Sequence, residues 1–161
     1  MQCIVSSAFG RIALTGSDRA VQSVRWVGCE EQVSDTAPRP GSVLSWAVRE
    51  LEEYAAGSRR QFEVPIELNG VNGAFHRLVL ETLLQTVGYS DTVTYGELAR
   101  RCGRPAAVRA VGTAMNKNPV PILIPCHRVL AKSGLGGFGP GVQIKRSLLA
   151  HEAKFTRSAL A

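Results

Sequence analysis

Short apolar runs separated by turn residues occupy the first 27 residues. Ile4-Val5 precedes a turn at Gly10, Ile12-Ala13-Leu14 precedes a turn at Gly16-Ser17-Asp18, and a third run covers residues 21–27. Runs of this length that are rich in β-branched residues and bounded by Gly, Ser and Asp are typical of β-strands. The pattern therefore predicts short antiparallel strands.

The spacing becomes helical after a polar loop at residues 28–41. Ser42 can cap a helix whose apolar positions recur every three or four residues until Gly57. Residues 62–68 then alternate like an edge strand, in which a proline is tolerated. The turn-forming residues 69–73 resemble a linker, so we predict a domain boundary between residues 1–70 and 71–161.

Helical spacing dominates the second part. It predicts a helix over residues 74–87, and a second helix over residues 95–102 with Thr94 as its cap and Glu97 completing a capping box. After a turn at Gly103-Arg104-Pro105, a third helix should begin at Pro105 and end at Met115. Helix, short turn and helix is the helix-turn-helix pattern, although many protein cores contain similar hairpins.

The segment that follows is unusual in composition. Three prolines surround an apolar, β-branched stretch within residues 118–129, which predicts an extended, buried backbone that stops sharply at Cys126. A glycine-rich loop at residues 133–141 and a helix over residues 143–153 complete the chain. The whole pattern predicts an α/β protein with an N-terminal domain of short antiparallel strands plus a helix. The C-terminal domain should be mainly helical, with a winged-helix-like helix-turn-helix.

Charge separates the two parts of the chain. Residues 1–70 hold 7 Lys/Arg and 9 Asp/Glu, a net charge of −2, whereas residues 71–161 hold 12 and 4, a net charge of +8. A basic second half suggests a polyanionic partner, although a solvated basic surface would give the same count.

The four cysteines are scattered, without the paired spacing of a metal ribbon or a disulfide scaffold. Their spacing fits a reducing compartment. We find neither an apolar run long enough to span a membrane nor a signal peptide. We therefore expect a cytoplasmic protein without a metal site or membrane contact.

Cys126 is the strongest candidate for chemistry. A buried cysteine is most often a small apolar residue, and a free thiol with a pKa near ~8.5 is only a few per cent thiolate at pH 7. His127 could accept the thiol proton, through a turn or a bridging water, with Glu152 of the last helix orienting the imidazole. Arg128 is expected to form a structural ion pair.

Residues 94–152 resemble the catalytic domain of the O6-alkylguanine-DNA alkyltransferases. The resemblance is carried, in order, by Thr94-Tyr-Gly-Glu-Leu-Ala99, Arg109-Ala-Val-Gly112, Asn118-Pro119, Ile124-Pro-Cys-His-Arg-Val129 and Leu148-Leu-Ala-His-Glu152. The first 70 residues match only loosely.

This resemblance implies a role for each matching position. Cys126 would accept the alkyl group, His127 would be a water-mediated base, Glu152 would orient it, and Asn118 would hold the turn around the cysteine. Tyr95 would donate a proton toward N3 of guanine and crowd the phosphate that rotates during base flipping, while Arg109 would fill the gap left in the base stack. The remaining DNA contacts would come from Thr94, Arg104, Ala106, Ala107 and Lys132, and the pocket from Met115, Pro121, Val129, Phe138 and Gly139.

The implied reaction is irreversible, stoichiometric transfer of an alkyl group from O6-alkylguanine in double-stranded DNA to Cys126, without a cofactor. The DNA would be contacted through the minor groove by a monomer, and cooperative binding stays open. The protein would lie in the cytoplasm or nucleoid of a prokaryote, or in the nucleus of a eukaryote. Phe138 and Gly139 replace the Tyr and Ser of many relatives, which puts acceptance of bulky alkyl groups in doubt.

Three other functions fit parts of the sequence. A damage sensor without catalysis would usually lack both the cysteine and the first domain. A cysteine hydrolase would use Cys126, His127 and Glu152 but would leave Arg109, Tyr95 and the basic charge unexplained. A helix-turn-helix regulator would need base-reading polar residues on its second helix, which is mostly Ala, Val and Gly.

Overall fold

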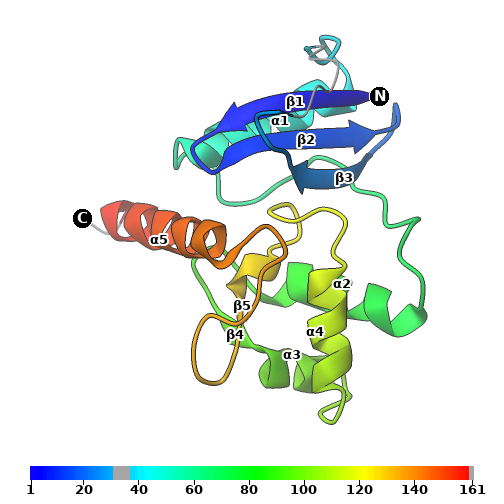
Figure 1. Cartoon of the computed structure of the whole chain (residues 1–161), viewed down its shortest axis with the longest axis vertical. Helices are drawn as coiled ribbons and strands as arrows, with labels where there is room; N and C mark the ends of the chain where they lie inside the picture. Colours follow the sequence, from blue (N-terminus) through cyan, green and yellow to red (C-terminus); the bar gives the residue numbers. More distant parts are fainter. Residues whose placement is uncertain (31–36, 160–161) are drawn as a thin grey trace. The chain divides into compact units, whose positions relative to one another are not determined.

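The structure, a computed structural model, describes residues 1–30 and 37–159 (Figure 1). The chain forms two compact units, Met1–Asn69 and Gly70–Ala161. The predicted fold class is confirmed: a small antiparallel sheet with one helix forms the first unit, and the second is mainly helical. Within the described ranges, no helix combines the length and apolarity that a membrane span needs.

The first unit is a three-stranded sheet beside one helix. Strands β1 (Gln2–Ser7), β2 (Gly10–Gly16) and β3 (Val21–Trp26) pair antiparallel in that order. Helix α1 (Val43–Ala55) packs against all three strands and buries the apolar face that its spacing predicts. The cap is confirmed, since the Ser42 side chain accepts a hydrogen bond from the backbone N–H of Ser45.

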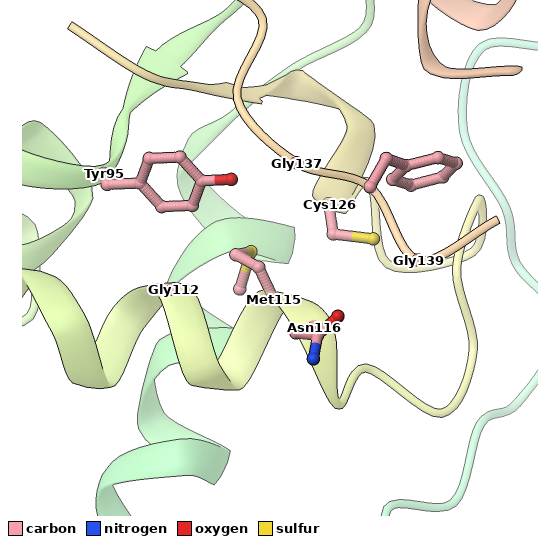
Figure 2. A pocket seen from close by; sticks show the side chains of 8 residues that line it. Tyr95, Gly112, Met115, Asn116, Cys126, Gly137 and Gly139 are labelled. Atoms are coloured by element: carbon pink, nitrogen blue, oxygen red, sulfur yellow. The ribbon is translucent and has the colours of Figure 1, made fainter. Parts of the chain in front are cut away.

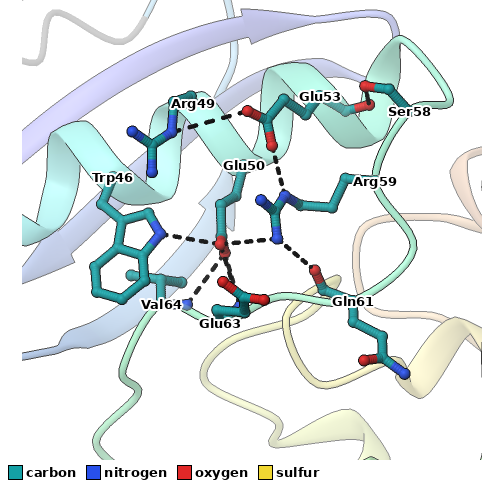
Figure 3. A network of polar contacts seen from close by, with 9 residues as sticks. All are labelled: Trp46, Arg49, Glu50, Glu53, Ser58, Arg59, Gln61, Glu63 and Val64. Atoms are coloured by element: carbon teal, nitrogen blue, oxygen red, sulfur yellow. Dashed lines mark hydrogen bonds and ion pairs between the residues drawn. The ribbon is translucent and has the colours of Figure 1, made fainter.

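A buried carboxylate on α1 binds the backbone of residues 63–64, near the end of this unit (Figure 3). Glu50 is fully buried and accepts hydrogen bonds from Trp46 Nε1 at 2.9 Å and from the backbone N–H groups of Glu63 at 3.0 Å and Val64 at 3.1 Å. Arg59 adds an ion pair at 3.0 Å. These partners satisfy the desolvated charge, as a buried carboxylate requires.

The predicted edge strand at residues 62–68 is wrong. Only one parallel bridge forms, in which Val21 donates to the carbonyl of Pro65 and Glu67 donates to the carbonyl of Val21. The reason is competition for donors, because the N–H groups of Glu63 and Val64 bind the Glu50 carboxylate.

The second unit is built on three helices that pack together: α2 (Ala74–Thr86), α3 (Tyr95–Arg101) and α4 (Val108–Asn116). A two-stranded parallel sheet joins β4 (Val93–Thr94) to β5 (Val129–Leu130). Helix α5 (Val142–Ala159) packs against the short 3₁₀ helix η1 (Cys126–Arg128). The chain thereby brings residues near 90, 128 and 150 together.

Three boundaries or faces differ from the prediction. Helix α4 begins at Val108 rather than Pro105, because residues 104–107 form a turn closed by a hydrogen bond from Ala107 N–H to the Arg104 carbonyl. Helix α5 continues beyond residue 153 to Ala159. In α2 the apolar spacing predicts one face formed by Phe75, Leu78, Val79, Thr82 and Leu83. The buried residues are instead Val79, Leu80 and Leu83, whereas Leu78 is 42% exposed.

Candidate active site

A side-chain-stabilised turn precedes the reactive cysteine. Asn118 donates from Nδ2 to the Ile124 carbonyl at 2.9 Å and accepts at Oδ1 from Val120 N–H at 3.1 Å. Ile124 N–H donates to the Val120 carbonyl, and Ile122 has φ of +73°, which a β-branched residue rarely adopts. The extended backbone predicted here is therefore wrong: Asn118 supplies hydrogen bonds that a sheet would otherwise provide.

Cys126 begins the 3₁₀ helix η1 and is only 5% exposed. Burial raises the pKa of its thiol to about 11, against smaller opposing effects from the Asn118 hydrogen bond and the Lys145 charge. The thiol is consequently protonated at neutral pH. Its pKa lies well above the ordinary cysteine value that was assumed from the sequence. Any reaction as a thiolate needs a base that removes this proton.

His127 lies beside Cys126 in the same turn and is fully buried. Its Nε2 is 2.7 Å from Oε1 of Glu152, and its Nδ1 is buried with no hydrogen-bond partner within the described part of the chain. Burial lowers the pKa of His127, which Glu152 opposes and the charges of Arg128 and Lys145 reinforce. A neutral imidazole that donates from Nε2 to the carboxylate keeps a lone pair on Nδ1, as a general base requires.

Glu152 anchors this arrangement from α5. It accepts from His127, from the guanidinium of Arg128 at 2.9–3.3 Å and from Ser90 N–H at 3.0 Å. Burial alone would raise the pKa of Glu152, but His127 and Arg128 outweigh it and bring the pKa to about 2. The carboxylate is therefore ionised at any working pH, and the predicted ion pair of Arg128 is confirmed.

Lys145 is a second buried cation at the site. Its Nζ donates to the carbonyls of Val129 at 2.6 Å and Gly137 at 3.1 Å. Burial lowers its pKa, which the nearby Cys126 opposes. The ammonium group thus joins the end of the cysteine turn to the glycine-rich loop.

A pocket of about 450 Å³ opens beside the thiol (Figure 2). Tyr95 enters from the start of α3, and its hydroxyl group points toward the side of the pocket where Cys126 lies. The lining residues are Tyr95, Gly112, Met115, Asn116, Cys126, Gly137, Phe138 and Gly139. Burial raises the pKa of the Tyr95 phenol, with a contribution from Cys126, so the phenol stays a proton donor.

The glycine-rich loop is shaped around Tyr95. Gly136 has φ of +70°, and a Cβ built there would lie 3.0 Å from a ring carbon of Tyr95 and 3.1 Å from its hydroxyl oxygen. A side chain at this position would strain the backbone and push the tyrosine ring. Glycine at 136 therefore allows the loop to approach Tyr95 closely.

The structure brings together five of the predicted site residues around the pocket: Tyr95, Met115, Cys126, Phe138 and Gly139. Pro121 and Val129 are buried but do not line it. The predicted DNA contacts lie outside the pocket, exposed or half-buried: Thr94 caps α3, Arg104, Ala106 and Ala107 precede α4, Arg109 lies in its first turn, and Lys132 follows β5.

Four residues at the site were not identified from the sequence: Gly112, Asn116, Gly137 and Lys145. For Lys145 a signal existed, because it shares a face of the last helix with Leu148 and Glu152, three and seven residues further on. A lysine on the inward face of an amphipathic helix needs buried partners. Asn116 and Gly137 carry no such signal. Within the described ranges, no group of His, Cys, Asp and Glu side chains could hold a metal ion.

Known proteins share this sequence and fold. A family model of the 6-O-methylguanine DNA methyltransferase DNA-binding domain matches residues 74–154. A methylated-DNA–protein-cysteine methyltransferase of Mycobacterium tuberculosis is 39% identical over 92% of this chain and 89% of its own. The human protein of that name is 35% identical over 92% of this chain and 78% of its own.

The structural comparison agrees. The crystal structure of Mycobacterium tuberculosis OGT in complex with DNA has a TM-score of 0.82 at 36% identity and covers 96% of this chain and 93% of its own. An O6-methylguanine-DNA methyltransferase from Pyrococcus kodakaraensis has a TM-score of 0.69 at 27% identity, with 94% and 99% covered. The family model, the sequence identity over nearly the whole length and the shared fold agree. The chain therefore belongs to the family of methylated-DNA–protein-cysteine methyltransferases.

Proposed function

We propose that this protein repairs DNA directly, by transferring an alkyl group from O6 of guanine to the thiol of Cys126. The observation that carries the proposal is the position of Cys126 between two proton-handling groups. Its thiol lines the pocket that also holds the Tyr95 phenol, and the next residue in the same turn is His127, which is fully buried and paired with Glu152.

The transfer needs one proton to leave the thiol and another to reach the leaving group. His127 Nδ1, acting through a water molecule, removes the thiol proton while the sulfur attacks the alkyl carbon. The S–C bond forms, the C–O6 bond breaks, and its electron pair goes to the guanine ring. Tyr95 donates a proton to that ring and regains one from solvent, while His127 releases the thiol proton to solvent, so the products are a thioether and neutral guanine.

Burial of the Cys126 thiol keeps it from reacting in the absence of substrate. With a thiol pKa of about 11, Cys126 is unreactive until the base and the substrate are both in place. A thioether offers no leaving group that His127 could help to expel, and so the reaction ends with a modified protein. We therefore expect one alkyl group per protein molecule and no turnover.

The substrate base has to leave the DNA duplex before it can enter the pocket. Flipping a base costs about a few kcal/mol, which protein contacts must offset. The start of α4 is suited to a close approach in the minor groove, since Ala106 is exposed, Ala107 is half-buried and Arg109 is exposed among small side chains. We propose that Arg109 fills the gap in the base stack, and that the exposed residues Thr94, Arg104 and Lys132 contact phosphates. The DNA complex of the Mycobacterium tuberculosis relative supports DNA as the partner.

The two units would divide the work. We propose that Gly70–Ala161 binds DNA and transfers the alkyl group, while Met1–Asn69 supports it. Phe138 and Gly139 at the pocket favour a methyl group as the main substrate. A protein that acts on the genome would lie in the cytoplasm and nucleoid of a prokaryote or in the nucleus of a eukaryote, as a monomer.

Stoichiometry tests this proposal against its rivals. Duplex DNA with radiolabelled O6-methylguanine, in tenfold excess, should label the protein to a limit of one methyl group per chain. Release of many products per chain would identify a hydrolase instead. Tight binding of the damaged duplex without label transfer would identify a damage sensor.

A further inference from the structure

Arg128 holds the Glu152 carboxylate by both of its oxygens. Its Nε is 3.0 Å from Oε2 and its Nη2 is 2.9 Å from Oε1, while Nη1 donates to the Val87 carbonyl at 3.1 Å. The guanidinium carbon also lies 5.7 Å from the centre of the Tyr89 ring, and Arg128 is 6% exposed. A planar fork that contacts both oxygens fixes the rotation of the carboxylate, which a lysine could not do.

His127 shares one of these oxygens. Oε1 lies 2.7 Å from His127 Nε2 as well as 2.9 Å from Arg128 Nη2, and Oε2 also accepts from Ser90 N–H. The plane and direction of the imidazole are therefore set by a carboxylate that Arg128 has already oriented. Arg128 is not among the residues that line the pocket.

The shared carboxylate also decides how strongly His127 binds a proton. The charged groups that act on His127 within the described chain are Glu152 and Lys145 from α5 and Arg128 from η1, with Cys126 as its neighbour. An unpaired buried carboxylate would hold a proton on His127 as a stable ion pair. Because Arg128 already compensates the Glu152 charge, the imidazole is left neutral and able to accept the thiol proton.

We propose that Arg128 is a positioning residue for alkyl transfer: through Glu152 it orients His127 and keeps it unprotonated at working pH. This inference rests on the proposed function, in which His127 is the base. Arg128 acts through its hydrogen bonds to the Glu152 carboxylate. Its contribution is to the starting state of the base.

The test is the pH dependence of single-turnover methyl transfer from duplex O6-methylguanine, measured between pH 5 and 9. In Arg128→Gln the positive charge is lost, so the acid limb of the profile should move to higher pH by about one unit or more. In Arg128→Lys the charge stays but the fork is lost, so the acid limb should stay in place while the plateau rate falls about tenfold.

A matched control comes from the neighbouring helix. Arg101 Nη1 donates to the Thr86 carbonyl at 2.9 Å, one residue before the carbonyl that Arg128 binds, and its ion pair is with Glu97 on the surface. Arg101→Lys should leave both the acid limb and the plateau unchanged. Circular dichroism at the assay temperature establishes that each variant is folded.

The outcomes separate the inference from the proposed function. If folded Arg128→Gln has its acid limb at the same pH as the wild type, the inference is overturned, even if the rate is lower. Loss of a residue with a merely structural role would lower the rate without moving the acid limb. If Arg128→Gln does not fold, Arg128→Lys decides: a wild-type plateau rate overturns the inference. Absence of transfer in the wild-type protein would instead refute the proposed function.

Discussion

Replacing Asn118 by alanine tests whether one side chain holds the cysteine turn. The change removes two hydrogen bonds and leaves the N–H of Val120 and the carbonyl of Ile124 without them, both in residues that are 0% exposed. Each buried polar group left unpaired costs about 1–3 kcal/mol, so we expect Asn118→Ala to destabilise its unit by about 2–4 kcal/mol. Since the Asn118 hydrogen bond lowers the pKa of Cys126, the variant should also transfer methyl groups more slowly.

Urea unfolding can assign this loss to the correct unit. Both tryptophans, Trp26 and Trp46, lie in the first unit, so their fluorescence follows its unfolding, whereas far-UV circular dichroism is dominated by the helices of the second. With a slope of about 2 kcal/mol per molar urea, the circular dichroism midpoint should fall by about 1–2 M. Asn116→Ala, at an exposed position two residues earlier, is the control and should move it little. A midpoint of Asn118→Ala within about 0.3 M of the wild type would refute the reasoning.

Three further predictions concern charge, backbone and DNA. The pKa of Glu152 is lowered from 4.5 to about 2, so its ionised form contributes about 3 kcal/mol of stability above pH 4.5, which is lost as the pH falls toward 2. Acid unfolding of Glu152→Gln should be flatter over this range, and an equal slope would contradict the assigned pairing. Gly136→Ala should lose about 1–2 kcal/mol of stability, because its φ is +70°, and at least half of the transfer rate. Gly137→Ala, where a Cβ meets open space, should keep its stability, and equal losses in the two variants would count against the loop geometry. Arg109→Ala should slow transfer from duplex DNA by about tenfold or more, while the reaction of Cys126 with a small alkylating reagent stays unchanged. Equal slowing of both reactions would exclude a role in base flipping.

Local patterns predicted most of the secondary structure. The strands around residues 2–26, the cap at Ser42 and the helix capped by Thr94 all follow from signals within a few residues of each element. The errors arose where distant groups compete for backbone hydrogen bonds. Residues 62–68 looked like a strand, but Glu50, more than ten positions earlier, takes two of their N–H groups.

The candidate site was predictable in its residue types but not in its physical state. Motif spacing identified Cys126, His127 and Glu152, yet a sequence does not state how deeply a thiol is buried. Burial is what raises the pKa of Cys126 to about 11 and makes a base necessary. Similarly, Lys145 gains its role only when the glycine-rich loop folds back and presents the Gly137 carbonyl to it.

The central claim is that the alkyl group ends on Cys126. The most direct test is the mass of the intact protein after incubation with duplex DNA that contains one O6-methylguanine, followed by peptide mapping. We predict a single gain of one methylene group, located on Cys126 and absent from Cys126→Ala. An unchanged mass with bound DNA, or a modification on another residue, would contradict the account.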